Sequence, residues 1–172
     1  MAFQQRLKRH AQLDILTILD DDYPPALLEA YQPPLVLFLR GQRALLTTRQ
    51  LAVVGARQAT SYAERVTTQL LAPLATAKLT IVSGLAKGAD GFAHRTALRF
   101  NLPTIGVIGT GLDISYPRQH RDLQQQISQV GLLISEYPLG VGPEPYHFVA
   151  RNRIIAGPVS YTHLTLPTTE RV

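Results

Sequence analysis

The sequence TIVSGLAKGADGFAHRTAL, residues 80–98, predicts a buried strand, a glycine-containing loop and a helix, in that order. The loop holds Gly84, Lys87 and Gly88, and Asp90 follows near the expected start of the helix. A plain connection between a strand and a helix needs one turn residue, so two glycines and a lysine indicate an additional role. Glycine permits positive φ angles and close approach of other groups to the backbone, which suits a ligand-binding loop.

Four short apolar runs set the fold class. They are LAVVG (51–55), LTIVSG (79–84), TIGVIG (104–109) and LLISE (132–136). Continuous apolar runs are typical of strands buried on both faces, as in a parallel sheet covered by helices. Segments with helical periodicity lie between the runs. The sequence therefore predicts an α/β fold, a Rossmann-like and mostly parallel sheet with helices on both faces and right-handed crossovers.

The first predicted helix covers residues 61–77, and Pro73 should kink or shorten it. Ser61 and Glu64 have the spacing of a capping box at its start. Asp90 is a natural N-cap for the helix that follows the second run. The apolar stripe expected to face the core of the first helix consists of Tyr62, Val66, Leu70 and Leu74.

Composition divides the chain into three regions. Residues 1–48 predict a short irregular or helical extension, with one strand in PPLVLFLRG (33–41). Residues 49–157 predict the Rossmann-like domain, which carries the four apolar runs and the loops that follow them. Residues 158–172 show neither helical periodicity nor glycine loops, so we expect a non-native or disordered tail, with a terminal edge strand as the alternative.

The overall composition favours a globular protein with a polyanionic partner. The chain of 172 residues has no cysteine, which excludes disulfides and thiolate zinc sites and is typical of a reducing cytosol. No apolar run approaches the roughly 20 residues of a membrane span, so we expect a cytoplasmic protein without membrane contact. The net charge is +5, and residues 49–157 hold eleven Lys and Arg against six Asp and Glu. Such a surplus in one domain suits a polyanion.

Each unusual loop follows a predicted strand, so we expect the loops to meet at the carboxyl edge of the sheet, where open α/β sheets bind ligands. Backbone amides and helix N-termini at such an edge favour phosphate oxygens. The predicted phosphate- or DNA-binding residues are Gly55, Arg57, Ser83, Gly84, Lys87, Gly88, Gly109, Gly111, Arg151, Asn152 and Arg153. The candidates for base stacking are Tyr137, Tyr146 and Phe148, and the residues expected to support the loops are Asp90, His94, Asp113 and Glu136.

No catalytic motif is evident. The chain lacks the G-x-x-x-x-G-K-[ST] sequence of P-loop NTPases and the G-x-S-x-G sequence of α/β-hydrolases, and no His, Asp and Glu residues have metal-ligand spacing. We therefore predict a binding surface for a polyanion, without catalytic residues, metal or cofactor. Two alternatives stay open. One is a nucleotide-binding or nucleotide-cleaving enzyme of a related Rossmann-like fold, with Glu136 or Asp113 as the acid/base, and the other is a scaffold for a protein partner.

Five segments together resemble one family, in its order. They are VVGARQATSYAERV (53–66), IVSGLAKGADGFAHRTAL (81–98), TIGVIGTGLDISYPRQHRDL (104–123), LLISEYPLGVGPEPYHF (132–148) and RNRIIAG (151–157). The resemblance is to the DNA-processing protein A family (DprA, also called Smf). It implies single-stranded DNA binding in the cytoplasm during natural transformation, protection of the incoming strand, loading of the RecA recombinase, and dimers.

The resemblance also carries site residues. It identifies Gly55 to Arg57 as the phosphate-binding loop, in which Ala56 stands where the family usually has Ser, so one hydrogen bond to phosphate is lost. The family's domain continues past RNRIIAG, so we expect a truncated chain, which lacks the dimer interface if that interface lies further on. The other matching positions are Ser83, Gly84, Gly88, Asp90, His94, Gly109, Gly111, Asp113, Tyr116, Pro117, Glu136, Pro138 and 151–153.

Overall fold

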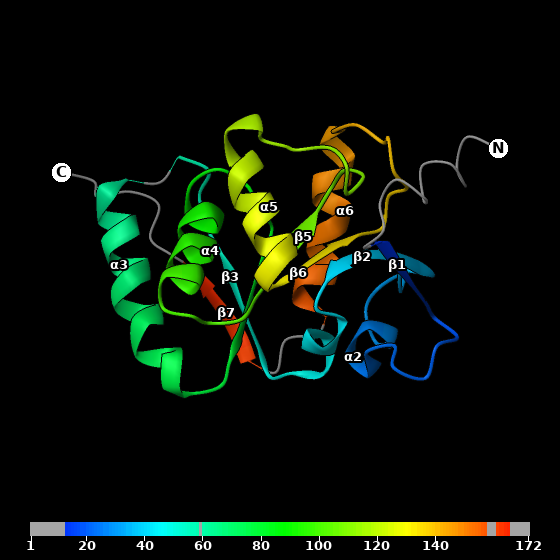
Figure 1. The fold of residues 1–172 in the computed structure, drawn as a ribbon, viewed down its shortest axis with the longest axis horizontal. Helices are drawn as coiled ribbons and strands as arrows, with labels where there is room; N and C mark the ends of the chain where they lie inside the picture. Colours follow the sequence, from blue (N-terminus) through cyan, green and yellow to red (C-terminus); the bar gives the residue numbers. More distant parts are fainter. Residues whose placement is uncertain (1–12, 59, 158–160, 166–172) are drawn as a thin grey trace.

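One mixed β-sheet forms the centre of the fold (Figure 1). The computed structural model describes residues 13–58, 60–157 and 161–165. Strands β3, β4, β5 and β6 are parallel neighbours, whereas β1 pairs with β2 and β2 with β6 in antiparallel fashion. The predicted α/β class with a mostly parallel sheet is confirmed. The order across the sheet is β1 (Leu13–Thr17), β2 (Val36–Gly41), β6 (Leu132–Ser135), β5 (Thr104–Ile108), β4 (Thr80–Ser83), β3 (Gln50–Val54) and β7 (Tyr161–Thr165).

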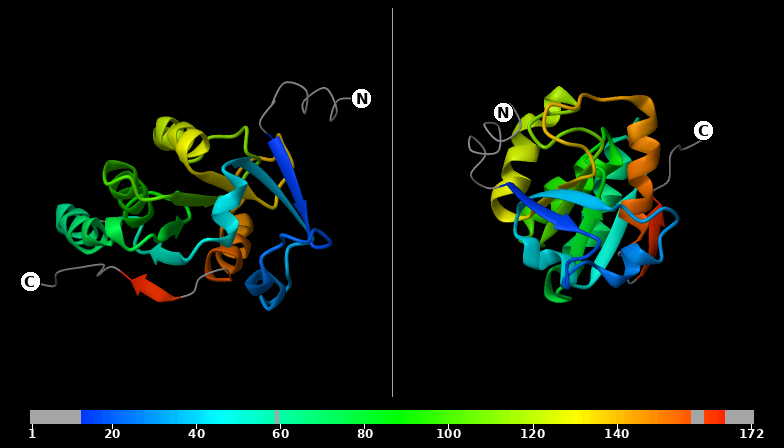
Figure 2. Two further views of the ribbon diagram at one scale, coloured as in Figure 1. Left: turned by 60° about the horizontal axis from the view of Figure 1, so that its bottom comes forward. Right: turned by 90° about the vertical axis from the view of Figure 1, so that its right-hand side faces the viewer.

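Helices cover both faces of the sheet (Figure 2). One face carries α3 (Ser61–Leu71), α4 (Ala89–Arg99) and α5 (Arg121–Val130), and the other carries α2 (Pro25–Leu28) and α6 (Pro145–Ala156). Successive strand residues point to opposite faces. In β4, Ile81 packs in the cluster that includes α3 and α4 residues, whereas Val82 packs in the cluster that includes Ile154 and Ile155 of α6. Burial on both faces explains why the strands are continuous apolar runs.

The first predicted helix is shorter than its periodic segment, as Pro73 indicated. Helix α3 ends at Leu71, and a 3₁₀ turn at Ala72–Thr76 contains the proline. Two details of the prediction are wrong. The N-cap is Thr60, whose hydroxyl accepts from the amide of Ala63 at 3.3 Å, so Ser61 and Glu64 form no capping box. The fully buried residues are Ala63, Thr67 and Leu71. Of the predicted stripe, Val66 and Leu74 pack against the core, but Tyr62 and Leu70 are 40% and 42% exposed.

The N-terminal region contributes two strands, where the sequence predicted one. β2 corresponds to the predicted strand, and β1 is the strand that was missed. The segment LDILT is short, and its pairing with β2, in which Ile15 faces Phe38, is a tertiary contact that local pattern does not contain. Residues 13–48 therefore extend the same sheet and are not separate from it.

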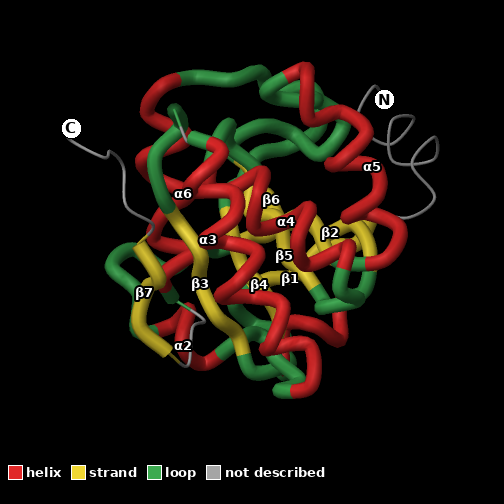
Figure 3. Tube along the Cα trace, turned by 90° about the vertical axis from the view of Figure 1, so that its left-hand side faces the viewer, coloured by secondary structure: helices red, strands yellow, loops and turns green. Residues whose placement is uncertain are grey.

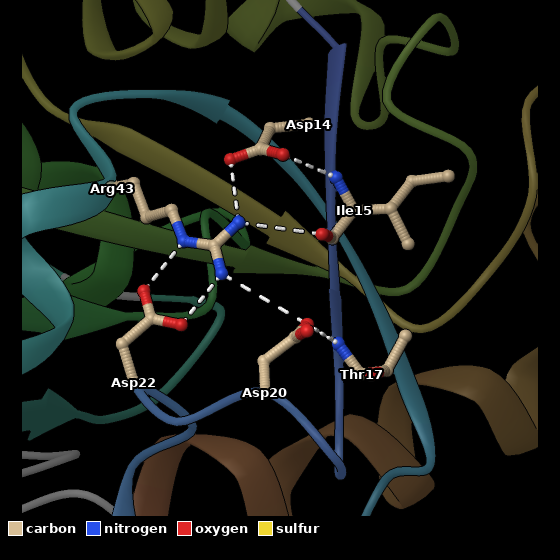
Figure 4. A network of polar contacts seen from close by, with 6 residues as sticks. All are labelled: Asp14, Ile15, Thr17, Asp20, Asp22 and Arg43. Carbon is tan, nitrogen blue, oxygen red and sulfur yellow. Dashed lines mark hydrogen bonds and ion pairs between the residues drawn. The ribbon is translucent and has the colours of Figure 1, made fainter.

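Arg43 fastens this N-terminal region together (Figure 4). It begins the 3₁₀ turn Arg43–Thr47 and donates from Nε and Nη2 to both carboxylate oxygens of Asp22, each at 2.7 Å. Its Nη1 donates to Asp14 Oδ2 in β1 at 2.8 Å, and Asp20 Oδ2 lies 3.9 Å from Nη2. The hydrogen bonds from Arg43 lower the pKa of Asp22 below its ordinary value. One guanidinium thus links β1, the acidic turn and the segment leading into β3.

The sheet ends at β7, which lies beside β3 in parallel orientation (Figure 3). An edge strand at 161–165 is the alternative that the sequence left open for the tail. Residues 158–160 and 166–172 lie outside the described residues, so the expectation for the rest of the tail stays a prediction.

We predict that Arg43→Ala lowers the melting temperature at neutral pH by at most about 4 °C, because the ion pairs are exposed and screened by solvent. Since the pKa of Asp22 is lowered in the folded state, its contribution is present above its unfolded pKa and is lost as pH falls through the folded value. The difference between variant and wild type in thermal unfolding should therefore vanish in acid. Arg65→Ala, an exposed arginine on α3, is the control. A difference that persists unchanged in acid would contradict the assignment.

Candidate functional site

Two adjoining cavities open at the carboxyl ends of β3, β4 and β5. The first cavity, of about 370 Å³, has a mixed lining that includes Gly55, Asp90, Asn152 and Ile155. The second cavity, of about 190 Å³, is lined by Lys87, Gly109, Ile108, Tyr116 and Pro117. The cavities share one wall, because four residues line both: Arg57, Ala86, Phe148 and Arg151.

Arg151 lies beneath both cavities and is 5% exposed. Its Nη1 donates to the carbonyls of Gly84 and Val107, the latter at 2.5 Å, and so ties α6 to the ends of β4 and β5. Asp90 Oδ2 lies 3.9 Å from Nη2. Burial lowers the pKa of Arg151 and raises that of the Asp90 carboxyl, and the opposite charge of each partner counteracts the shift. Arg151 is therefore held in the interior while it lines both cavities, and its predicted contact with phosphate stays a prediction.

Two of the predicted glycines permit close packing of the loops. A Cβ at Gly84 would overlap the guanidinium of Arg151. At Gly88, where φ is +75°, a Cβ would overlap the carbonyl oxygen of Ala56 and lie 2.6 Å from that of Arg57. The β4–α4 loop consequently packs directly against the β3–α3 loop. These two glycines shape the site through packing, and Gly88, instead of Asp90, is the N-cap of α4.

Phe148 forms the aromatic part of the shared wall. Gly109 leaves room for it, since a Cβ there would lie 3.0 Å from Phe148 Cδ1. The ring of Tyr116 lies with its centroid 5.2 Å away at an angle of 34°. The guanidinium carbons of Arg57 and Arg151 lie 6.0 and 5.9 Å from the Phe148 centroid, at the limit of cation–π distance. A half-buried ring among cations can receive a second flat group.

Three predicted residues project at the rim of the cavities with polar groups exposed. Arg57 follows β3 and Lys87 follows β4, and both are exposed. Asn152 is exposed on α6, and its Oδ1 accepts from Nε of Arg151 at 3.1 Å. The exposed cationic groups of the site are thus Arg57 and Lys87, whereas the charge of Arg151 is buried.

Two predicted phosphate ligands point elsewhere. Ser83 is fully buried, and its hydroxyl donates to the carbonyl of Val53 at 2.6 Å, so it joins β4 to β3. Gly111 uses its amide for the carbonyl of Val141 at 2.9 Å and packs against Pro138. Ser83 ends β4 and Gly111 follows β5, but the polar groups of both residues form hydrogen bonds inside the protein.

Arg153 lies outside both cavities, which corrects its predicted place in the cluster. It donates to Glu136 Oε1 at 2.6 Å and to the carbonyl of Gln32 at 2.8 Å. Residues two apart on a helix differ by about 200° around its axis, so Arg151 and Arg153 face different sides of α6. The charge of Arg153 is paired with that of Glu136 and fastens α6 to the segment that follows α2.

The two tyrosines predicted to stack on bases are engaged by His147. The ring of Tyr137 stacks on His147 with centroids 3.8 Å apart, and that of Tyr146 meets it edge-on at 4.4 Å. His147 in turn donates from Nδ1 to the carbonyl of Gly109 at 3.1 Å. Of the three aromatic candidates, Phe148 is the one that lines the cavities.

The residues predicted to support the loops have internal partners. His94 is fully buried with Nδ1 at 2.8 Å from Thr104 Oγ1, and burial lowers its pKa to about 3, so it is neutral. Asp113 Oδ1 accepts from the amide of Gly140 at 2.8 Å. Glu136 pairs with Arg153. Asp90 accepts from the amide of Ala86 at 3.3 Å and faces Arg151.

Some site residues received no role from the sequence. Ala86, Tyr116 and Pro117 line the cavities, although the last two were matched only as part of a motif. Ala86 lies in the loop after β4, and Tyr116 and Pro117 lie in the loop after β5, and these positions are the signal that places them at this edge. His120 donates from Nδ1 to the carbonyl of Leu85 at 3.0 Å and had no such signal.

Two kinds of feature are missing from the part of the chain that the structure describes. It contains no cluster of three or more His, Asp or Glu side chains arranged to hold a metal ion. None of its helices combines the length and the apolar character needed to cross a bilayer.

The sheet topology defines a Rossmann-like domain, with cationic, glycine-lined cavities at the carboxyl edge of its sheet, the edge where open α/β sheets bind ligands. Residues 14–166 match the family model for DNA recombination-mediator protein A, and the chain belongs to this family. The resemblance inferred from the five motifs is thereby confirmed.

Relatives and solved structures agree with this assignment. The chain is 45% identical over 162 residues to protein Smf of Synechocystis, covering 89% of this chain and 40% of that protein. It is 44% identical over 150 residues to DNA processing protein DprA of Streptococcus pneumoniae, covering 87% and 53%. The chain thus spans about half or less of these two relatives.

Two solved structures share the fold. The X-ray structure of DNA processing protein A from Streptococcus pneumoniae superposes with a TM-score of 0.88 at 40% identity, covering 98% of this chain and 59% of that one. DNA processing protein A from Helicobacter pylori, whose structure describes a single-stranded DNA binding mode, gives a TM-score of 0.80 at 32% identity, covering 90% and 68%.

We predict that Gly88→Ala destabilises the protein by about 2 kcal/mol or more, because it combines a positive φ with overlap of backbone atoms. The matched control is Gly142→Ala, since a Cβ at Gly142 meets nothing within 4 Å and its φ is ordinary. Urea unfolding of the two variants measures the difference. Equal stability of both variants would contradict the packing of the two loops.

Proposed function

We propose that this chain binds single-stranded DNA at the two cavities and acts in DNA processing. The observation that carries the proposal is the shared wall, where the half-buried ring of Phe148 lies beside the exposed cation of Arg57. A positive groove with an aromatic platform is the general means of holding a single strand, because the backbone is anionic and every base has a flat face. The single-stranded DNA binding described for the Helicobacter pylori relative supports it.

In this proposal the site residues divide between two tasks. Arg57 and Lys87 contact phosphate oxygens from the rim, and Gly55 and Asn152 line the first cavity where a phosphate would lie. Arg151 adds a fixed positive charge from beneath. Phe148 offers its ring to a base, a contact worth roughly 1–3 kcal/mol in sites of this kind. Gly84, Gly88 and Gly109 keep the backbone close enough for these groups to converge.

The geometry does not favour the enzymatic alternative. Glu136 is paired with Arg153, and Asp113 lines a separate depression beside Arg40 and Arg121. Neither carboxylate lines the two cavities. The carboxylate that does line the first cavity, Asp90, is buried against Arg151 and the amide of Ala86. An acid/base residue must reach the bond that it cleaves.

The family description supports a further part of the proposal. A recombination mediator delivers bound DNA to a recombinase, so we propose that this protein protects the strand and assists loading of a RecA-type recombinase in the cytoplasm during natural transformation. The family resemblance implies dimers, and this chain dimerises only if the interface lies within the part of its relatives that it spans. RecA filament growth on pre-coated strands is the assay that addresses the loading step.

We predict that Arg57→Ala weakens binding of a short oligothymidylate roughly 10- to 100-fold, because one charge-assisted contact to phosphate is lost. The slope of log K against log salt should fall in magnitude by about 0.7, the value for one phosphate contact on a single strand. Fluorescence anisotropy over a range of salt concentrations measures both.

Arg99→Ala is the matched control for this experiment. Arg99 is exposed at the end of α4 and lies 5.5 Å from the ring of Phe100, so it repeats the arginine–phenylalanine pair away from the cavities. It should leave affinity and salt slope unchanged. Equal losses from both variants would indicate a diffuse charge effect and would remove the loop after β3 from the site.

A further inference from the structure

The outer edge of β1 ends the sheet within the residues that the structure describes. β1 pairs with β2 on one side, and the described residues place no strand on its other side. The amide of Ile18, just past β1, donates to the carbonyl of Leu35 on the β2 side at 3.0 Å. Main-chain groups alternate in direction along an antiparallel strand, so those of Ile15 and Thr17 point away from β2. Such an edge is a template on which a further strand can pair.

The outward main-chain groups of Ile15 and Thr17 already have partners. The Ile15 amide donates to Oδ1 of Asp14 at 2.8 Å, and the Thr17 amide donates to Asp20 Oδ2 at 2.6 Å (Figure 4). Arg43 Nη1 donates to the Ile15 carbonyl at 3.3 Å, and the Asp20 amide donates to the Thr17 carbonyl at 3.0 Å. Side chains and a turn therefore occupy the hydrogen-bonding positions that a neighbouring strand would use.

Arg43 holds this arrangement from outside β1. The Asp14 carboxylate accepts from the edge amide through Oδ1 and from Arg43 Nη1 through Oδ2, at 2.8 Å in both cases. Asp22 in turn accepts from Nε and Nη2 of Arg43 and so fixes the guanidinium. A strand that paired with β1 would have to displace the whole network.

The surface beside this edge carries exposed apolar side chains. The β1–β2 register places Ile15 and Val36 on one face of the sheet, and each is 38% exposed. Leu19 and Leu35 lie next to the end of the β1–β2 pairing and are 89% and 66% exposed. Apolar groups beside a strand edge favour association once the edge is open. The edge is therefore covered where association would otherwise be favoured.

We propose that Asp14, Asp20 and Arg43 form a cover that keeps the edge of β1 from pairing with the same edge of a second copy of this chain. A second copy is the partner that fits, because two identical edges pair antiparallel about a two-fold axis. Such pairing would join two sheets into one and bring Ile15 against its counterpart. This surface is separate from the two cavities, which open at the ends of β3, β4 and β5.

The experiment measures the mass of the full chain by light scattering after size exclusion, over a range of concentrations. Asp14→Ala combined with Asp20→Ala removes both acceptors and should raise the mass to about twice that of wild type or more, because the edge amides become free to pair. Asp21→Ala combined with Glu29→Ala is the matched control, since it removes the same charge from exposed positions and should keep the wild-type mass. An unchanged mass for the first variant would overturn the proposal.

Further variants separate the hydrogen-bonded cover from charge repulsion. Asp14→Asn combined with Asp20→Asn removes the same charge but keeps a side-chain oxygen for each edge amide, so it should keep the wild-type mass. If it associates as strongly as the alanine variant, repulsion keeps the copies apart and the cover is wrong. Adding Ile15→Lys to the alanine variant should abolish association, because lysine on an edge strand opposes pairing. Association that persists would place the contact elsewhere and overturn the pairing of β1.

Wild type provides a test that does not depend on the folding of any variant. Amide hydrogen exchange, followed by NMR, should be roughly 10-fold or more slower at Ile15 and Thr17 than in an unstructured chain, because both amides are hydrogen-bonded. Exchange of these two amides at the rate of an unstructured chain would show an open edge and contradict the proposal.

Discussion

The site depends on one buried guanidinium. Arg151 crosses from α6 to the carbonyls of Gly84 and Val107 at the ends of two parallel strands, with Asp90 facing it. Desolvating a cation is costly, and a buried ion pair alone is weak evidence of stabilisation. Here the guanidinium also donates to two buried carbonyls at the strand ends, and removing a partner from a buried polar group is expensive. Its position fixes the register of α6 on the sheet.

The register of α6 on the sheet decides which of its side chains line the cavities. With Arg151 pointing inward, Phe148 one turn earlier lies against Gly109, between the loops that carry Arg57 and Tyr116. The N-terminal region helps to position α6, because Arg153 on the other side of the helix donates to the carbonyl of Gln32, between α2 and β2. One helix is thus fastened on two sides, and the cavities form where its inner side meets the strand ends.

Local sequence pattern was sufficient for strands β2 to β6, for the helices between the parallel strands and for the edge at which the loops meet. Burial on both faces leaves continuous apolar runs, and glycine marks places where the backbone must approach other atoms. Local sequence pattern was insufficient to assign the partner of each polar group. Ser83 reads as a loop ligand, but its partner Val53 is thirty residues away in sequence. RNR reads as exposed, and only the contacts to strand-end carbonyls show that Arg151 is buried. The opposite direction of Arg153 follows from helical spacing and was available from the sequence.

The most direct test of this account is the free energy of unfolding of Arg151→Leu in urea, measured beside Arg57→Ala. A buried, structural Arg151 predicts a loss of about 3–5 kcal/mol, since Asp90 and two carbonyls would lose their partner. Arg57→Ala should stay within about 0.5 kcal/mol of wild type, as is usual at exposed positions. If Arg151→Leu were as stable as wild type, the guanidinium would not be holding the site together, and the account would be contradicted.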